Sequence, residues 1–279
     1  MSRVAVAGAT SPASTVRSAL RGAEARLTAA GSESARLDAE LLLADALALD
    51  RAALYAHAGR VLSTEVAAAF AHHLGRRAAS EPVTYILGRR AFRRLELEVD
   101  SRVLIPRPET ELLVEVGVRA LPHGGRVHDV GTGSGAIALA LKHERPDLVV
   151  SASDVSAPAI SVARANAARL GLDVELSYRS GLPEADFDLV VANLPYIRDD
   201  EWSGLAPDIV HYEPREALLG GGCDGLDAIR ELVAAVPQGM WLALEHAPAQ
   251  AAAVRALLRR AESHRGLSGE EDITLGHAP

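Results

Sequence analysis

Cysteine is almost absent from the 279-residue chain, because Cys223 is the only one. A single cysteine permits no internal disulfide and no cluster of metal-binding thiolates, which fits a reducing compartment. No apolar run approaches the ~20 residues of a membrane-spanning helix, and the start, rich in Ser, Arg and Ala, lacks the apolar block of a secretory signal. We therefore expect a cytoplasmic protein with no membrane partner and no bound metal.

An excess of positive charge is also missing. The formal net charge is −8, with 29 Lys and Arg residues against 37 Asp and Glu residues. Proteins that bind nucleic acids in general need surplus basic residues to replace the counterions of the phosphate backbone. We expect no direct nucleic-acid partner, although one group of arginines leaves a local basic patch open: Arg76, Arg77, Arg89, Arg90, Arg93 and Arg94.

The composition, 48% hydrophobic and 24% charged, is that of a soluble globular protein. Residues 15–77 are rich in Ala and Leu at helical spacing, which predicts several short helices. Residues 81–108 contain β-branched and aromatic residues, a predicted turn at Gly88-Arg89-Arg90 and the alternation LELEV, which together indicate a hairpin. We expect a helical domain at 1–80, a hairpin linker at 81–108 and a third part at 109–279.

The third part has the pattern of an α/β domain. Strand-like runs alternate with helix-like segments there, which is typical of a mostly parallel sheet covered by helices. The predicted strands lie near residues 126–130, 148–152, 174–178, 188–192 and 240–244.

A glycine-rich loop follows the first of these strands. Its residues are Gly131, Thr132, Gly133, Ser134 and Gly135, and a helix-like segment comes next. Glycines at such a turn let the backbone lie close against a ligand. The loop lacks the Lys-Ser/Thr of a phosphate-cradling loop, and its spacing differs from the G-x-G-x-x-G of dinucleotide-binding proteins. The sequence therefore predicts a cofactor site of another kind.

A carboxylate sharpens this prediction. Asp154 ends the next strand, 25 residues after Asp129, near the place where an acidic side chain accepts both hydroxyls of a ribose. A ribose-bearing ligand without a required diphosphate is favoured, and S-adenosylmethionine is the common one. Two alternatives stay open: Asp154 could cap the helix that begins at Ser156, and Asp129 could hold the glycine-rich turn through backbone N–H groups.

The fourth strand ends abruptly in Asn193, Leu194, Pro195 and Tyr196. The amide oxygen of Asn193 and the main-chain carbonyl of Leu194 are two acceptors for the hydrogens of a planar NH2 group, and Pro195 biases Leu194 toward an extended conformation. Tyr196 offers a flat face for packing. Holding both hydrogens aims the nitrogen lone pair at a methyl sulfonium, and no strong general base is required if the proton leaves after transfer.

The tetrapeptide NLPY resembles the [N/D]-P-P-[Y/F/W] signature of methyltransferases that modify planar nitrogens. Further blocks make the chain similar to the HemK/PrmC family of release-factor glutamine methyltransferases, from about residue 20 to the C-terminus. These blocks are YILG (85–88), VLIPRPETE (103–111), DVGTGSGAIAL (129–139), EPREALLGG (213–221), DGL (224–226) and LEH (244–246).

The resemblance implies a helical N-terminal domain that docks the release factor, a hairpin linker and a seven-stranded Rossmann-like methyltransferase domain. It also implies the reaction, methyl transfer from S-adenosylmethionine to the amide nitrogen of the glutamine in the Gly-Gly-Gln loop of class I release factors. This modification supports translation termination. A monomer is expected.

Residue by residue, the resemblance implies that the loop Gly131, Thr132, Gly133, Ser134 and Gly135 lines the methionine end of the cofactor. Asp154 would bind the ribose and Leu182 would pack on the adenine. The glutamine would be held by Asn193, Leu194, Pro195 and Tyr196, with Asn193 also next to the cofactor. The pocket wall would be shaped by Arg107, Pro108, Glu109 and Thr110.

Four positions depart from the family pattern. Leu194 replaces the commoner proline, and Ser180-Gly181-Leu182 lacks the acidic residue that usually receives the adenine. Ala247 and His128 stand where a glycine and an apolar residue are commoner, which we interpret as structural drift. Two other functions stay open: an adenine-N6 methyltransferase acting on RNA or DNA, with the arginines above as its basic groove, and a non-catalytic binding protein with a methyltransferase fold.

Overall fold

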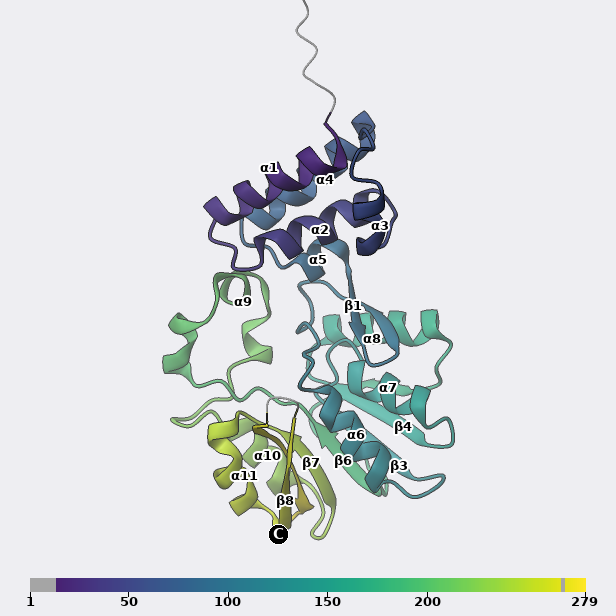
Figure 1. Ribbon diagram of the computed structural model, residues 1–279. Coiled ribbons are helices and arrows are strands. Elements are labelled where there is room, and N and C mark those ends of the chain that lie inside the picture. Colours follow the sequence, from purple (N-terminus) through teal and green to yellow (C-terminus); the bar gives the residue numbers. More distant parts are fainter. Residues whose placement is uncertain (1–13, 267–268) are drawn as a thin grey trace, which may run out of the picture. The chain divides into compact units, whose positions relative to one another are not determined.

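The computed structural model describes residues 14–266 and 269–279. The predicted lack of a secretory signal concerns residues 1–13 and so lies outside the described residues. The chain forms two compact units, Met1–Leu87 and Gly88–Pro279 (Figure 1). Within the described residues, no helix combines the length and the apolar character needed to cross a membrane.

The first unit is helical, as the Ala- and Leu-rich pattern predicts. Three of its helices are capped by a side chain that accepts a backbone N–H of the first turn. The capping residues are Thr15, Asp50 and Ser63, which are of the types favoured at this position. Leucines such as Leu42 and Leu54 fill its core. The helices are α1 (Val16–Ala29), α2 (Ala35–Ala46), α3 (Arg51–Ala56), α4 (Thr64–Ala78) and α5 (Val83–Leu87).

The second unit begins with an antiparallel hairpin of β1 (Arg89–Phe92) and β2 (Leu95–Glu98). The predicted turn at Gly88-Arg89-Arg90 is wrong, because Arg89 and Arg90 lie in β1 and the chain reverses at Arg93 and Arg94. Arg93 adopts a left-handed φ of 53°. Its backbone N–H donates to Glu111 at 3.0 Å and its guanidinium pairs with Glu144 at 2.7 Å. These distant acids stabilise a turn that the local sequence does not signal.

A seven-stranded sheet forms the centre of the second unit. Its strand order is β5-β4-β3-β6-β7-β9-β8, and the first five strands in this order are parallel. These five lie where the apolar runs predict them, and β8 and β9 add an antiparallel edge. The strands are β3 (Arg126–Val130), β4 (Val149–Asp154), β5 (Glu175–Tyr178), β6 (Leu189–Ala192), β7 (Trp241–Glu245), β8 (Arg259–Arg265) and β9 (Glu271–His277).

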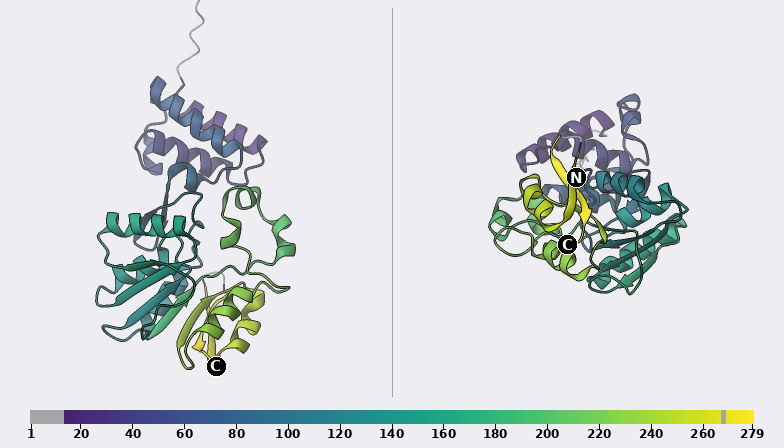
Figure 2. Two further views of the ribbon diagram at one scale, coloured as in Figure 1. Left: turned by 180° about the vertical axis from the view of Figure 1, so that it is seen from behind. Right: turned by 90° about the horizontal axis from the view of Figure 1, so that it is seen from below.

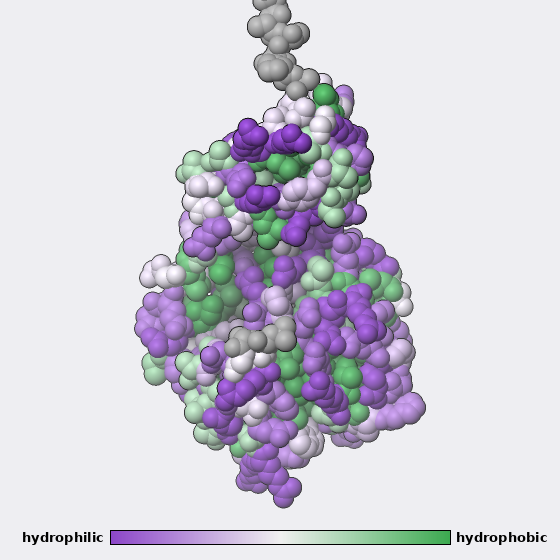
Figure 3. All heavy atoms as spheres, viewed as in Figure 1, coloured by the Kyte–Doolittle hydropathy of each residue, from purple (hydrophilic) through white to green (hydrophobic). Residues whose placement is uncertain are grey.

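Helices cover both faces of this sheet (Figures 1 and 2). On one face, Val190 and Leu244 belong to an apolar cluster with Ile229 and Val254 from two of the helices. The helices that follow β3 and β4 cover the other face, as right-handed crossovers require. The longer helices are α6 (Glu111–Ala120), α7 (Ala136–Glu144), α8 (Ala157–Leu170), α10 (Asp227–Ala235) and α11 (Ala251–Leu257), and α9 (Pro207–Tyr212) is a short excursion. On the visible surface of this unit, hydrophilic residues predominate between scattered hydrophobic ones (Figure 3).

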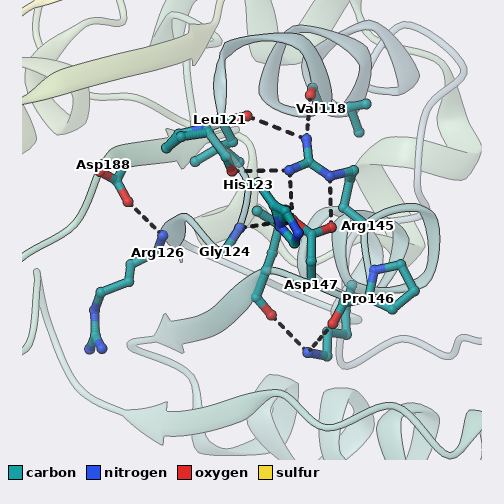
Figure 4. A network of polar contacts seen from close by, with 12 residues as sticks. Val118, Leu121, His123, Gly124, Arg126, Arg145, Pro146, Asp147 and Asp188 are labelled. Carbon is teal, nitrogen blue, oxygen red and sulfur yellow. Dashed lines mark hydrogen bonds and ion pairs between the residues drawn. The ribbon is translucent and has the colours of Figure 1, made fainter.

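A polar network closes the amino-terminal edge of the strands (Figure 4). The guanidinium of Arg145 donates to the carbonyls of Val118 and Leu121 at 3.0 and 3.3 Å and pairs with Asp147 at 2.7 Å. Asp147 also accepts the backbone N–H of Gly124 at 2.9 Å. The Arg145 contact, followed by this backbone bond, holds the pKa of the Asp147 carboxyl well below its usual range. The network lies opposite the carboxyl ends of the strands, where α/β sheets bind ligands.

Asn166 of α8 connects the hairpin to the rest of the second unit. Its side chain is fully buried and accepts the N–H of Glu98 at 2.7 Å. The same amide donates to the carbonyls of Glu98 and Ser134 at 2.9 and 3.0 Å. Buried backbone groups need such partners, so this one side chain satisfies three main-chain groups from two other parts of the chain.

Replacing Asn166 by alanine should lower the free energy of unfolding by about 2 kcal/mol, because one buried and two partly buried main-chain groups lose their partner. Ser161→Ala, at an exposed position of the same helix, should change it by no more than about 0.5 kcal/mol. Urea unfolding followed by circular dichroism measures both. Equal stability of the two variants would contradict a structural role for Asn166.

Candidate active site

Three strand ends meet at the carboxyl edge of the sheet. The register pairs Val130 of β3 with Ser153 of β4 and with Ala192 of β6. The residues that follow, Gly131, Asp154 and Asn193, therefore lie side by side, and all three line one cavity of about 460 Å³. A cavity at the point where the strand order reverses is the usual ligand site of such a sheet.

The glycine-rich loop forms one wall of the cavity through Gly131 and Gly133. Gly131 has a φ of +76°, a left-handed conformation that favours glycine, and a Cβ there would lie 3.0 Å from the Leu194 side chain. Thr132 and Ser134 are buried behind the wall, and Gly135 is the capping residue before α7. The loop thus offers main chain rather than side chains to the cavity.

Asp129 holds this loop from below. Its fully buried carboxyl accepts the Thr132 hydroxyl at 2.6 Å and the N–H of Ala138 at 3.3 Å. Burial raises the pKa of Asp129 to about 7, against the opposing effect of these two hydrogen bonds. One backbone N–H and one hydroxyl therefore anchor the turn to this carboxyl.

Asp154 stands at the edge of the cavity, at the end of β4. One carboxylate oxygen accepts the N–H of Gly133 at 2.9 Å and the other accepts the N–H of Ser156 at 2.8 Å. The alternative that Asp154 caps α8 is wrong, because Ser156 is the capping residue and accepts the N–H of Ala159. Burial raises the pKa of Asp154, and the two backbone donors lower it. The side chain keeps lone pairs for a ligand.

His128 connects the centre of the sheet to the loop after β5. Its ring is fully buried and bonds to the hydroxyls of Ser151 and Ser153, at 2.8 and 2.9 Å. Ser153 donates in turn to the carbonyl of Gly181 at 3.2 Å. Burial lowers the pKa of His128 to about 4, so the ring is neutral near pH 7. In the sequence, the only sign of this network is a polar residue in an otherwise apolar strand. In the structure, the network reaches the cavity wall at Gly181.

The loop after β5 meets the cavity through Arg179, Ser180 and Gly181. Leu182 is not one of the cavity-lining residues, and it packs instead against the apolar cluster beneath α10. The side of the cavity near β4 also includes Val155, whose side chain is largely exposed.

The segment after β6 supplies Asn193, Leu194 and Pro195 to the cavity. The Asn193 amide donates to the hydroxyl of Thr110 at 3.1 Å. Tyr196 does not line the cavity, and its hydroxyl donates to Glu245 at 3.5 Å. Burial, followed by the charge of Glu245, raises the pKa of Tyr196 above its ordinary value.

The predicted wall at residues 107–110 divides into different surroundings. Arg107 forms an ion pair with the buried Glu213, whose other oxygen accepts the N–H of Ile105 at 3.1 Å. Pro108 and Glu109 are exposed, and Thr110 is buried against Asn193. Residues just before this segment line the cavity: Arg102, Val103 and Leu104.

Comparison with known proteins identifies the family. Residues 18–88 match the PrmC N-terminal domain, and residues 107–222 match the methyltransferase small domain. The chain is 42% identical to the release factor glutamine methyltransferase of Xylella fastidiosa, over 91% of this chain and 98% of that protein. The same identity is found to the release factor glutamine methyltransferase of Geobacter sulfurreducens, over 88% of this chain and 89% of that protein.

The chain belongs to the family of release factor glutamine methyltransferases. The likeness drawn from the sequence motifs is thereby confirmed. Among solved structures, the Mtq2–Trm112 complex of E. cuniculi, responsible for methylation of the termination factor eRF1, is also similar. It has 22% identity and a TM-score of 0.45, over 64% of this chain and 99% of that chain.

The family motif GGCDGL (221–226) and the glycine before it hold the segment after β6. The N–H of Gly220 donates to the Ile197 carbonyl at 3.0 Å, and the N–H of Ile197 donates to the Leu218 carbonyl at 2.9 Å. A Cβ on Gly220 would lie 1.9 Å from the carbonyl oxygen of Gly225, and one on Gly225 would lie 2.3 Å from that of Tyr196. Gln250 donates to the Tyr196 carbonyl at 2.8 Å. In the sequence, only the glycine-rich block indicates that these contacts exist.

Gly220→Ala should lower the free energy of unfolding by about 1–3 kcal/mol or more, since the added methyl group meets rigid backbone. Gly204→Ala is the matched control, because no atom lies within 4 Å of a Cβ placed there. Thermal unfolding of the two variants beside the wild type measures the difference. If Gly220→Ala unfolds at the same temperature as the control, the close packing of the two loops is not required.

Proposed function

We propose that this protein transfers a methyl group from S-adenosylmethionine to the side-chain amide nitrogen of the glutamine in the Gly-Gly-Gln motif of class I release factors, and so supports translation termination in the cytoplasm. One observation carries the proposal. In a chain of this family, the amide of Asn193 and the main chain of Leu194 border the same cavity as the glycine-rich loop and Asp154.

The residues around the cavity fit S-adenosylmethionine. A volume of about 460 Å³ is within the range of small-molecule sites. Gly131 and Gly133 leave main chain exposed for the methionine end, and the carboxylate of Asp154 accepts hydroxyl groups of a ribose. Val155 and Gly181 would border the adenine, with Leu182 supporting this end from the core. When bound, the cofactor supplies a methyl group on a positively charged sulfur.

The segment after β6 would bind the glutamine. The Asn193 side-chain oxygen and the Leu194 carbonyl accept the two hydrogens of the amide, and Pro195 limits the main-chain freedom of Leu194. Tyr196 would pack against the substrate. Fixing a poor nucleophile in one orientation supplies several kcal/mol by proximity. Thr110 supports Asn193, and the other members of the wall, Arg107, Pro108 and Glu109, would shape the entrance.

The alternative of a nucleic-acid adenine methyltransferase is not favoured. Its basic groove needs free arginines, but Arg77 pairs with Asp38 at 2.7 Å, and Arg93 pairs with Glu115 and Glu144 at 2.8 and 2.7 Å. A non-catalytic role is not favoured either, because the cavity is open and bordered by the acceptor groups of the reaction. The proposal includes that the protein acts as a monomer and makes no direct contact with nucleic acid.

Incubation with methyl-labelled S-adenosylmethionine and a class I release factor should place label on the factor. A factor whose Gly-Gly-Gln glutamine is replaced by alanine is the matched control and should remain unlabelled, as should bulk RNA in a third sample. Label on RNA would favour the adenine methyltransferase. An absence of label in all three samples, with the fold intact, would refute catalysis.

Asn193→Ala should lower kcat by roughly 100- to 1,000-fold, because the substrate amide loses one of its two fixed acceptors. Binding of S-adenosylmethionine, measured by calorimetry, should stay within a few fold, since the glycine-rich loop and Asp154 are unchanged. The thermal unfolding temperature reports whether the fold is kept. A well-folded variant with near-normal kcat would show that the two-acceptor arrangement is not the basis of transfer.

A further inference from the structure

Thr110 uses its hydroxyl in an unusual way. It is the capping residue of α6, where a threonine ordinarily accepts a backbone N–H of the first turn, a contact worth about 1 kcal/mol. Here the side chain makes no such bond. Its oxygen instead accepts the Nδ2 hydrogen of Asn193 at 3.1 Å, from a residue 83 positions later in the chain. The hydroxyl hydrogen therefore needs an acceptor elsewhere.

The buried carboxyl of Glu245 is the acidic group nearest to this hydroxyl in its electrostatic effect. The register pairs Ala192 of β6 with Leu244 of β7, so the next residues, Asn193 and Glu245, are neighbours at the carboxyl edge of the sheet. Glu245 is buried, with 2% of its surface exposed. The Thr110 hydroxyl interacts with this carboxyl and lowers its pKa, as the Tyr196 hydroxyl does. Among the described residues, the Oε2 atom of Glu245 has no hydrogen-bond partner, so this oxygen can still accept a hydrogen.

A carboxylate accepts hydrogen bonds and donates none. A Thr110 hydroxyl that donates its hydrogen to Glu245 leaves its oxygen to accept from the Asn193 NH2 group, which is the contact that the structure shows. The Oδ1 atom of Asn193 consequently faces away from Thr110. The order of donors and acceptors thus decides which end of the Asn193 amide is turned toward the cavity.

We propose that the Thr110 hydroxyl donates to the unpartnered Oε2 of Glu245, and that Glu245 is thereby a positioning residue, which acts through Thr110 to hold the Asn193 amide with its oxygen presented to the substrate. The inference rests on the proposed function, because an oxygen is the end that accepts a hydrogen of the substrate amide. A reversed Asn193 would present an NH2 group to another NH2 group. The two groups would then have no acceptor between them.

The arrangement depends on pH. Burial raises the pKa of Glu245 to about 7; Thr110 lowers it, Glu109 and Asp272 raise it by their charges, and the Tyr196 hydroxyl lowers it. The charge of Arg107, which is paired with Glu213, acts to lower the pKa of Tyr196. His246, the residue after Glu245, has its own pKa lowered by burial.

A protonated Glu245 can donate to Thr110, which frees the Thr110 hydroxyl to donate to Asn193 and turns the amide round. The oriented form therefore increases as pH rises through about 7. The rate of transfer should rise with it to a plateau.

The chain offers a direct readout, because its only asparagines are Asn166 and Asn193. Selective 15N-asparagine labelling of the full chain gives two side-chain NH2 signals, and Asn193→Asp identifies one by its loss. In the wild type, the Asn193 signal should titrate with a midpoint near pH 7 and should not do so in Glu245→Gln. The Asn166 signal, held by carbonyls of Glu98 and Ser134, should stay constant and report that the unit is folded.

Kinetics test the consequence. At saturating release factor, Glu245→Gln should lower kcat between roughly 10- and 100-fold, leave the KM for S-adenosylmethionine within about twofold and remove the pH dependence near 7. Thr110→Val should resemble it, and Thr110→Ser, which keeps the hydroxyl, should restore the wild-type rate. Asp272→Asn removes a charge that raises the pKa of Glu245, so its midpoint should move to lower pH with an unchanged plateau.

Two results would overturn the inference: full kcat and an unchanged pH profile in Glu245→Gln, or an Asn193 signal that does not titrate in the wild type. Each can occur while the wild type still methylates the release factor, in which case only the positioning role fails. A wild type that labels no release factor refutes the proposed function and the role in catalysis with it. The Asn193 titration then still decides whether Glu245 orients the amide.

Discussion

The parallel pairing of β3 with β4 and β6 is the constraint on which the site depends. Parallel strands end at the same edge of a sheet, and the register stops these three at Val130, Ser153 and Ala192, in line with one another. This register makes neighbours of three groups that are far apart in the sequence: the glycine-rich loop, the carboxylate of Asp154 and the amide of Asn193. A shift of one residue in either pairing would separate the glycine-rich loop from the segment after β6.

The irregular segment after β6 has lost the hydrogen bonds of a strand and needs others in their place. Backbone from residues 218–225 supplies part of them, and close packing there requires glycine at Gly220 and Gly225. Side chains supply the rest, from Gln250 behind Tyr196 and from Thr110 behind Asn193. The proposed acceptor groups are therefore held on the side away from the cavity, which leaves the cavity side free for ligands.

Much of the fold follows from local pattern, because a buried parallel strand is a continuous apolar run and a helix has a regular apolar spacing. The same reasoning misses β8 and β9. The sequence of β8, RRAESHR, is polar because every residue of this edge strand is exposed or only partly buried. It also misplaces the hairpin turn, since Arg93 keeps its left-handed conformation through acids of α6 and α7. His128 appears as drift in the sequence and as part of a buried hydrogen-bond network in the structure.

The sequence by itself determined the parallel strands, the glycine-rich loop, the carboxylate after β4 and the NLPY segment, because each depends on residues adjacent in the chain. Only the tertiary structure decided what stands behind them. Asn193 and Thr110 are 83 residues apart, and Tyr196 and Gln250 are 54 apart, so no local spacing brings them together. Such pairs form because the sheet places remote segments at one edge, where buried polar groups must find partners.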